Sequence, residues 1–340
     1  MTTPATSAPT LRYMKTVGFT ADFGGRGFHL PTAMAVRNDG HIFVMSRSSA
    51  TATLGLRIVE CDLDDNFYGE FGSHGKGAGQ FIWPSALTIG PDSRLYVADD
   101  ALNRITVFDP DDNLVATWGE EGLERGQFSG PSGLAFDPEG NLLVVDHRNH
   151  RVQMFSTEGK HISTFGSHGT DDGQFNYPWG IGVDANGLVY VADWRNDRIQ
   201  RFSPDGGFID AFGESGRASG QLSRPTDVAV SADGTVYVAD WMNQRVQVFD
   251  SSWRFIESLR GQATLSKWAV EYLAANADEQ RARESFSPVI EVDTDDPHEQ
   301  SARIESYFWD PVDVEVDGAG RLYVLETNRN RFQVYGPSGG

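Results

Sequence analysis

The stretch that decides the fold spans residues 177–202 and reads YPWGIGVDANGLVYVADWRNDRIQRF. It opens with a proline and a short run of small and branched residues, which ends at an Asn-Gly turn. A second apolar run follows and ends in Val-Ala-Asp, and a loop with Asn and Arg leads into a third. Short apolar runs around an Asn-Gly turn are typical of antiparallel hairpins. The stretch therefore predicts three short strands joined by two turns.

Near-copies of this stretch occur along the whole chain. Each copy begins at a proline, and these prolines are Pro31, Pro84, Pro131, Pro178, Pro225 and Pro311. Three successive spacings are 47 residues, and a fourth run in most copies ends in Phe-Gly or Trp-Gly. Units of four short strands at this period are the pattern of propeller blades, which bury their faces against neighbouring blades. The sequence therefore predicts six such blades.

The string Asp-x-x-Asn-x-Arg-Ile/Val-Gln-x-Phe with its closing Phe-Gly resembles the NHL repeat, from about Arg12 onward. Six such repeats imply an all-β fold, a six-bladed β-propeller. The last unit stops after its third strand at residues 331–335, whereas residues 13–18 form a strand without a hairpin partner. We therefore expect the N-terminal strand to complete the last blade and pair otherwise open edges. Residues 1–10 are then a disordered tail, and 11–340 one propeller.

The longest spacing, between the fifth and sixth prolines, holds an insertion at residues 261–307. Residues 266–275 have helical spacing with Ser266 as a candidate N-cap, and the helix is expected to continue to about Glu284. The insertion joins a fourth strand to a first strand, so we expect it on the same end of the propeller as the other links of that kind. There it would act as a lid over the channel mouth or as a dimerisation element.

Charge and composition exclude several classes of protein. The formal net charge of −20 disfavours nucleic-acid binding, because no concentrated basic patch is present to offset it. One cysteine, Cys61, permits neither an internal disulfide nor a cysteine-cluster metal site. The N-terminus lacks the pattern of a signal peptide, and no apolar run approaches the ~20 residues that span a bilayer. We therefore expect a cytoplasmic protein without a membrane partner.

Two kinds of link meet at one end of an up-and-down propeller, here called the top face. They are the links from a fourth strand to the next first strand and the links between second and third strands. Their residues combine aromatic rings with cations, which suits a small carboxylate-bearing or aromatic substrate. The predicted substrate-binding residues are Trp83, Arg148, Trp179, Trp194, Arg195, Trp241 and Trp309. The predicted catalytic residues are Arg47, His147 and Glu326.

Acidic residues end five of the second strands, at Asp99, Asp146, Asp193, Asp240 and Glu326. A ring of carboxylates near the central channel would accommodate a divalent cation or supply a general base. Because Asp belongs to the ordinary repeat pattern, most of these carboxylates are expected to hold loop amides. Glu326 and Ser46 break the pattern and are the better functional candidates. We predict no other cofactor and no dedicated metal ligands.

Among six-bladed NHL-type enzymes, the peptidyl-hydroxyglycine amidating lyases offer the nearest comparison by residue. Residues 44–47, Val-Met-Ser-Arg, resemble the segment of that family that carries a catalytic arginine, which implies such a role for Arg47. The resemblance fails at the zinc site, because Ser85, Trp179 and Val312 stand where that family has histidines, and Arg148 stands at its tyrosine position. The sequence therefore favours a lyase or hydrolase that does not depend on zinc. The alternative is a non-catalytic scaffold that binds a protein on the same face.

Overall fold

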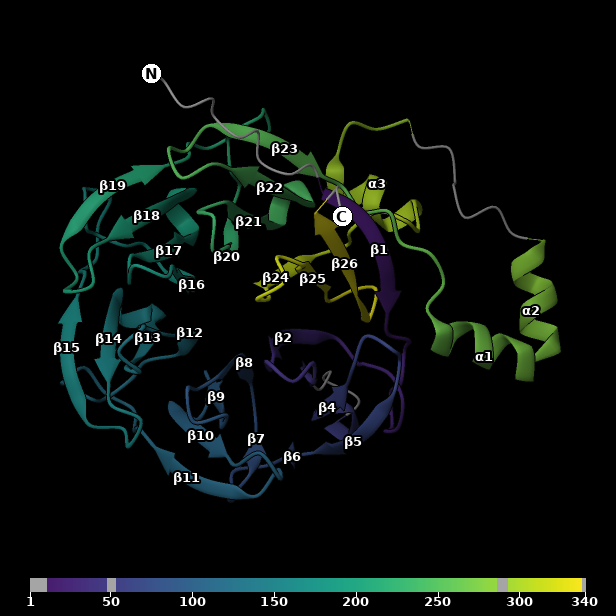
Figure 1. The fold of residues 1–340 in the computed structure, drawn as a ribbon, viewed down its shortest axis with the longest axis horizontal. Coiled ribbons are helices and arrows are strands. Elements are labelled where there is room, and N and C mark those ends of the chain that lie inside the picture. Colours follow the sequence, from purple (N-terminus) through teal and green to yellow (C-terminus); the bar gives the residue numbers. More distant parts are fainter. Residues whose placement is uncertain (1–10, 48–52, 286–292, 338–340) are drawn as a thin grey trace.

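The structure is a computed structural model that describes residues 11–47, 53–285 and 293–337. Six four-stranded antiparallel sheets surround a central channel, as Figure 1 shows. The prediction of an all-β, six-bladed propeller is confirmed. Each first strand begins at an opening proline, whose fixed φ and missing N–H suit the start of a strand.

Blades one to five are each built from consecutive hairpins. Blade one contains β2 (Pro31–Val36), β3 (Ile42–Ser46), β4 (Arg57–Cys61) and β5 (Phe67–Phe71). Blade two contains β8 (Pro84–Ile89), β9 (Leu95–Asp99), β10 (Arg104–Phe108) and β11 (Leu114–Trp118). Blade three contains β12 (Pro131–Phe136), β13 (Leu142–Asp146), β14 (Arg151–Phe155) and β15 (His161–Phe165). Blade four contains β16 (Pro178–Val183), β17 (Val189–Asp193), β18 (Arg198–Phe202) and β19 (Phe208–Phe212). Blade five contains β20 (Pro225–Val230), β21 (Val236–Asp240), β22 (Arg245–Phe249) and β23 (Phe255–Leu259).

Blade six draws its strands from both ends of the chain. It contains β24 (Pro311–Val316), β25 (Leu322–Glu326), β26 (Arg331–Pro337) and β1 (Leu11–Val17). β1 pairs antiparallel with β26, with a register shift between Tyr13 and Lys15. The N-terminal strand thus supplies the outer edge of the last blade.

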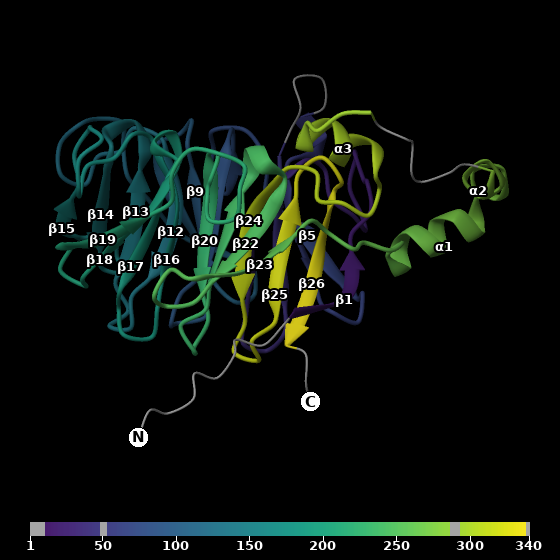
Figure 2. The same cartoon turned by 90° about the horizontal axis from the view of Figure 1, so that it is seen from above.

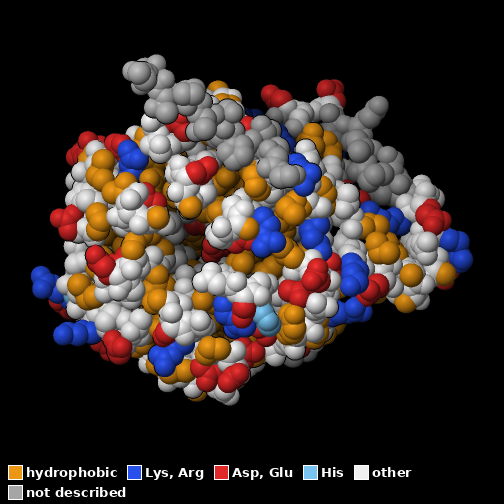
Figure 3. Space-filling view, viewed as in Figure 1, with side chains coloured by type: hydrophobic (Ala, Val, Ile, Leu, Met, Phe, Trp, Pro, Cys, Tyr) orange, Lys and Arg blue, Asp and Glu red, His pale blue; other side chains and the backbone are white. Residues whose placement is uncertain are grey.

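The core lies between blades rather than at one centre. One cluster joins Val145 and Val152 of blade three to Val191 and Phe202 of blade four, and similar clusters fill the other blade boundaries. Short elements complete the links. They are β6 (Ser73–His74), β7 (Gln80–Phe81) and the 3₁₀ turns η1 (Thr53–Gly55), η2 (His147–Asn149), η3 (Trp194–Asn196) and η4 (Trp241–Asn243). The face seen in Figure 3 carries acidic, basic and apolar side chains intermingled.

The described residues of the insertion form three helices, α1 (Lys267–Ala275), α2 (Ala277–Glu284) and α3 (Pro297–Arg303). The Ser266 side chain caps α1 by accepting from the Ala269 N–H, and the predicted single helix is interrupted at Asn276. Figure 2 shows α1 and α2 projecting sideways from the disc, whereas α3 lies at one of its faces. The helices α1 and α2 therefore do not cover the channel mouth, which differs from the expected lid. Their position follows from Trp268, which is buried in the core cluster of blades six and one.

Candidate functional site

A cavity of about 250 Å³ occupies the channel mouth on the top face. Of the predicted site residues, the structure brings five together as its lining: Arg47, Trp83, Trp179, Trp194 and Trp241. Asp310, which precedes the sixth opening proline, also lines the cavity and was missed by the sequence analysis. The combination of indole faces with one guanidinium and one carboxylate suits a flat organic ligand with a charged group.

The residue that follows each opening proline lies just inside the mouth, and blade four differs from four other blades at this position. In four blades the residue after the opening proline is Ser or Thr, and its hydroxyl donates to a backbone carbonyl of the next blade. These bonds run from Thr32 to Pro84 (3.3 Å), Ser85 to Pro131 (2.6 Å), Ser132 to Trp179 (2.9 Å) and Thr226 to Pro311 (3.4 Å). Blade four has Trp179 at this position, and its indole lines both the mouth and the channel below.

Arg47 lies directly after the last residue of β3, and its guanidinium carbon lies 4.7 Å from the centroid of the Trp83 ring. Burial lowers the pKa of Arg47, and the nearby charge of Asp310 opposes that shift. The side chain stays protonated at any physiological pH, because an arginine begins far above that range. A half-buried, positioned guanidinium of this kind is a suitable anchor for a carboxylate.

Two further guanidiniums stack on the opposite wall. Arg224 lies 4.7 Å and Arg195 5.6 Å from the centroid of Trp194, and Arg195 also lies 4.5 Å from that of Tyr177. Trp194 in turn stacks with Trp241 at 6.4 Å. Arg195 and Arg224 are exposed, so the cations form the rim of this wall and the indoles its inner surface.

His147 and Arg148 form a separate cluster behind Trp179. The His147 Nε2 lies 3.0 Å from one Asp100 oxygen, and Arg148 donates to both oxygens of the same carboxylate at 2.7 and 3.0 Å. Burial raises the pKa of Asp100, but these two partners outweigh it and leave the pKa below its usual range. His147 is only 6% exposed, and Trp179 packs against its ring. Neither residue lines the mouth cavity, which differs from the expected role in contacting substrate.

Glu326 is a structural residue rather than a channel carboxylate. It is fully buried and accepts hydrogen bonds from Trp309 N (3.1 Å), Arg331 Nε (2.8 Å) and Gln333 Nε2 (2.7 Å). Asp193 of blade four makes the same set of bonds, to Asn176 N, Arg198 and Gln200. The longer side chain of Glu326 thus fills the ordinary Asp position of the repeat, and a catalytic role for it stays a prediction. Ser46 is likewise buried and accepts from the His29 N–H.

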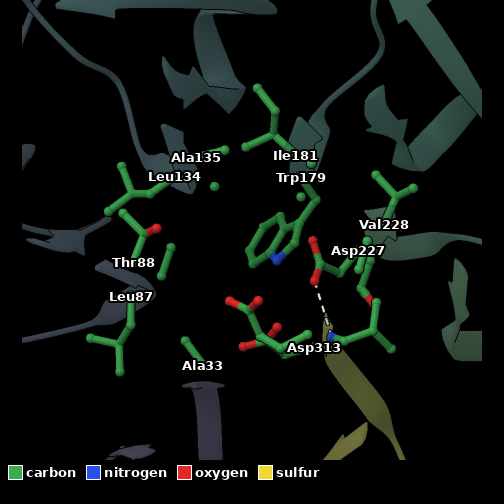
Figure 4. Close-up of a pocket in the computed structure, with 18 of the residues that line it drawn as sticks. Ala33, Leu87, Thr88, Leu134, Ala135, Trp179, Ile181, Asp227, Val228 and Asp313 are labelled. Atoms are coloured by element: carbon green, nitrogen blue, oxygen red, sulfur yellow. Dashed lines mark hydrogen bonds between the residues drawn. The ribbon is translucent and has the colours of Figure 1, made fainter. Parts of the chain in front are cut away.

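The acidic groups of the channel are instead on the first strands of blades five and six. Asp227, Asp313 and Glu315 line a cavity of about 270 Å³ that continues from the mouth, and Figure 4 shows the first two beside Trp179. Asp227 accepts from the Val314 N–H at 3.0 Å, and Asp313 from the Met34 N–H at 2.5 Å. Each carboxylate thus joins its own blade to the next.

Burial raises the pKa of each of these three carboxyl groups. The pKa of Asp313 rises to about 6, and those of Asp227 and Glu315 are raised well above their usual values by burial and, secondly, by the neighbouring negative charge of Asp313. The sequence signal was present in the first strands, which read PTDVAV and PVDVEV where other blades have small or apolar residues.

The last predicted residue, Trp309, lies outside the mouth cavity and contacts the insertion. Its Nε1 lies 3.2 Å from His298 Nε2 on α3, and Arg329 lies 5.0 Å from its ring centroid. α3 also approaches η4, which carries Trp241. Among the described helices of the insertion, α3 is the one beside the mouth. A lid role stays a prediction for α3 alone.

Among the described residues, no three His, Cys, Asp or Glu side chains are grouped so that they could hold a metal ion. No helix within the described ranges is long and apolar enough to cross a membrane.

A comparison with known protein families identifies part of the repeated sequence. The family model described as "NHL repeat" matches residues 128–155, 175–202 and 222–249. No curated protein sequence matches the chain.

Solved structures with a similar fold cover nearly the whole chain. A catalytically inactive virginiamycin B lyase from Staphylococcus aureus with quinupristin is 14% identical, with a TM-score of 0.56 over 96% of this chain and 89% of that one. A streptogramin B lyase is 12% identical, with a TM-score of 0.57 over 98% and 89%. A protein of unknown function from Bacteroides thetaiotaomicron is 15% identical, with a TM-score of 0.61 over 96% and 75%. The chain is thus a six-bladed β-propeller that carries NHL repeats.

Proposed function

We propose that this propeller is a small-molecule enzyme of the lyase or hydrolase type, whose carboxylate-bearing or aromatic substrate binds in the mouth cavity. One observation carries the proposal: the mouth cavity shares Trp179 and Val312 with the channel below, so binding groups and titratable groups line one continuous space. A surface that binds a protein partner would need only the mouth, without the titratable groups of the channel below.

Binding is assigned to the mouth. The indoles of Trp83, Trp179 and Trp194 offer flat faces for stacking, and Arg47 supplies a fork of donors for a carboxylate. Because the guanidinium is half-buried, its attraction for an anion is screened less than that of an exposed arginine.

Acid or base chemistry is assigned to the channel carboxyl groups. A pKa of about 6 lets the Asp313 group hold a proton or give it up near neutral pH, which is the range in which general acids and bases work best. Asp313 lines the channel cavity, which shares Val312 with the mouth cavity, so the proposed acid or base lies next to the proposed substrate site. Arg47 is the substrate anchor in this scheme.

Two of the structural neighbours are named as lyases, virginiamycin B lyase and streptogramin B lyase. At 12% and 14% identity, this likeness is one of fold, so it supports the proposal without fixing a substrate. Proteins of similar fold therefore include lyases.

The second candidate is a non-catalytic scaffold, which two exposed side chains favour. Trp83 is 43% and Met242 41% exposed at the mouth, as expected of anchors for a protein partner. Dimerisation through the insertion is a related proposal, because Val270 on α1 is 51% exposed.

The test compares ligand binding and turnover in three variants of the full chain. Aromatic carboxylates are titrated by calorimetry. Arg47→Ala should weaken binding at least tenfold. Asp313→Asn should keep binding but abolish any turnover. Arg254→Ala is the control and should change neither, because Arg254 is exposed and far from the mouth. Wild-type binding that survives intact in Arg47→Ala would remove the proposed site. Turnover that survives in Asp313→Asn would remove the proposed acid or base.

A further inference from the structure

Two arginines of the top face, Arg195 and Arg224, contact an aromatic ring instead of a carboxylate. Most described arginines pair with a carboxylate, as Arg151 does with Asp146 and Arg198 with Asp193. Within the described ranges, Arg195 and Arg224 form no ion pair and instead lie over the Trp194 ring. In a chain of net charge −20, two unpaired cations on one indole mark a place where an anion is attracted.

This pair of cations lies across the mouth from Arg47. Arg47 follows β3 of blade one, whereas Trp194 belongs to blade four and Arg224 precedes the first strand of blade five. Blades one and four are opposite one another in the six-membered ring, as Figure 1 shows. Trp83 under Arg47 and Trp194 under Arg195 and Arg224 line the same cavity. The mouth is therefore an aromatic cavity with Arg47 in its lining on one side, and with Arg195 and Arg224 at the exposed rim beyond Trp194 on the other.

We infer that the ligand of the mouth is an elongated diacid: a flat apolar body with one anionic group at Arg47 and a second at Arg195 and Arg224. This inference rests on the proposed function and specifies its substrate class. A guanidinium held over an aromatic ring keeps its edge free, and that edge carries the donors that grip a carboxylate or phosphate in pairs. The indoles between the two ends then stack on the body of the ligand.

Other arginines of this face are already committed. One terminal nitrogen of Arg148 donates to both oxygens of Asp100, and one terminal nitrogen of Arg329 points to the backbone carbonyls of Ser301, Ala302 and Ile304. Both side chains are thus already held by groups of the protein. The two anchors are therefore Arg47 and the pair on Trp194.

Asp310 makes the two ends unequal. It lines the cavity on the Arg47 side, where its oxygens accept from Gln244 and Asn328. Its negative charge partly offsets Arg47, so an anion at that end gains less than one at the rim. The rim pair should consequently contribute at least as much to the affinity for a diacid as Arg47 does, even though it is more exposed.

The experiment uses matched probes that differ by one charge. Terephthalate is compared with its monoamide, 4-carbamoylbenzoate, and biphenyl-4,4′-dicarboxylate with its monoamide, so that two spans are sampled. Binding to the full chain is followed by calorimetry and by quenching of tryptophan fluorescence. At one of the two spans, the diacid should bind about tenfold or more tightly than its monoamide, as expected for one additional charge-assisted pair.

The variants separate this inference from the proposed function. Removing either anchor, by Arg195→Gln/Arg224→Gln or by Arg47→Gln, should abolish the advantage of the diacid over its monoamide. Arg217→Gln is the control for loss of charge on this face, because Arg217 pairs with Asp296, and it should leave the ratio unchanged. Equal affinities for diacid and monoamide at both spans would overturn the two-ended ligand and leave the pocket standing. If neither probe bound the wild-type chain at millimolar concentration, the pocket itself would fall.

Discussion

The indole nitrogen of Trp268 donates a hydrogen bond to the backbone carbonyl of Asp65, at 2.8 Å. This bond joins the insertion, which follows blade five in the sequence, to a turn of blade one. The Trp268 ring is 2% exposed and packs against Phe28, 5.8 Å between centroids. The Ser266 hydroxyl adds a bond to the carbonyl of Gly18, which follows β1. Helix α1 therefore fastens the region where the ring closes.

Trp268→Ala should destabilise the propeller by about 3–5 kcal/mol, because it removes a large buried ring and leaves a cavity. The measurement is the free energy of unfolding in urea. Val270→Ala, on the exposed side of the same helix, is the matched control and should cost less than about 1 kcal/mol. Similar losses of unfolding free energy in both variants would show that the stabilisation does not come from the buried indole.

Asp313 should make stability depend on pH. Burial raises its pKa to about 6, so the folded protein holds this proton more tightly than the unfolded chain does. The stabilisation is therefore present below about pH 4 and is lost as the pH rises through about 6. Asp313→Asn, which keeps an oxygen for the Met34 N–H, should raise stability at pH 7 by about 1–2 kcal/mol and flatten the pH profile between pH 4 and 7. A variant that is less stable than the wild type at pH 7 would contradict this assignment.

Glu326→Ala should unfold the protein rather than merely inactivate it. The change leaves the buried Arg331 without its carboxylate, which costs about 3–5 kcal/mol. Thermal unfolding measures the effect, and Asp240→Ala in blade five should match it, because Asp240 pairs with Arg245 in the same way. Asp278→Ala, in an exposed pair on α2, should have almost no effect. Normal stability in Glu326→Ala would contradict the structural role assigned to the Glu326–Arg331 pair.

Trp179→Ser should empty the mouth without unfolding the blade. Serine is the residue found at the same position in blades two and three, where its hydroxyl bonds to the next blade. We expect the affinity for aromatic carboxylates to fall about tenfold and the free energy of unfolding to change by less than about 1 kcal/mol. Trp253→Phe, at the opposite end of blade five, controls for the loss of an indole and should leave ligand affinity unchanged.

The fold was predictable because its signals are local. The opening prolines and the turn glycines lie within a few residues of the strands they delimit, and Pro178, for example, is the first residue of β16. The helix start at Ser266 was predictable for the same reason, since an N-cap is a contact across one turn.

The site was less predictable because it depends on register. The pairing of first and second strands shifts after the opening proline in every blade, as between Pro225 and Asp227. A shift of this kind changes which side chains face the channel. Asp227 and Asp313 therefore line the channel, whereas the acids that end the second strands do not.

His147 shows a second limit. The loop that carries it was placed correctly on the top face, but its burial depends on Trp179, which comes from the next blade. Contacts between residues that are far apart in the chain are set by the packing of whole blades and leave no local pattern.

Because blade six combines β1 with β24, β25 and β26, the order of synthesis affects when the ring can close. β1 is synthesised before the other strands of the propeller, yet its partner β26 is synthesised after them. Blades one to five can form their hairpins in order as they emerge, but the ring must stay open, with the edge of β1 waiting, until β24, β25 and β26 are available. An elongating ribosome therefore carries an incomplete ring, and a late step joins its two ends.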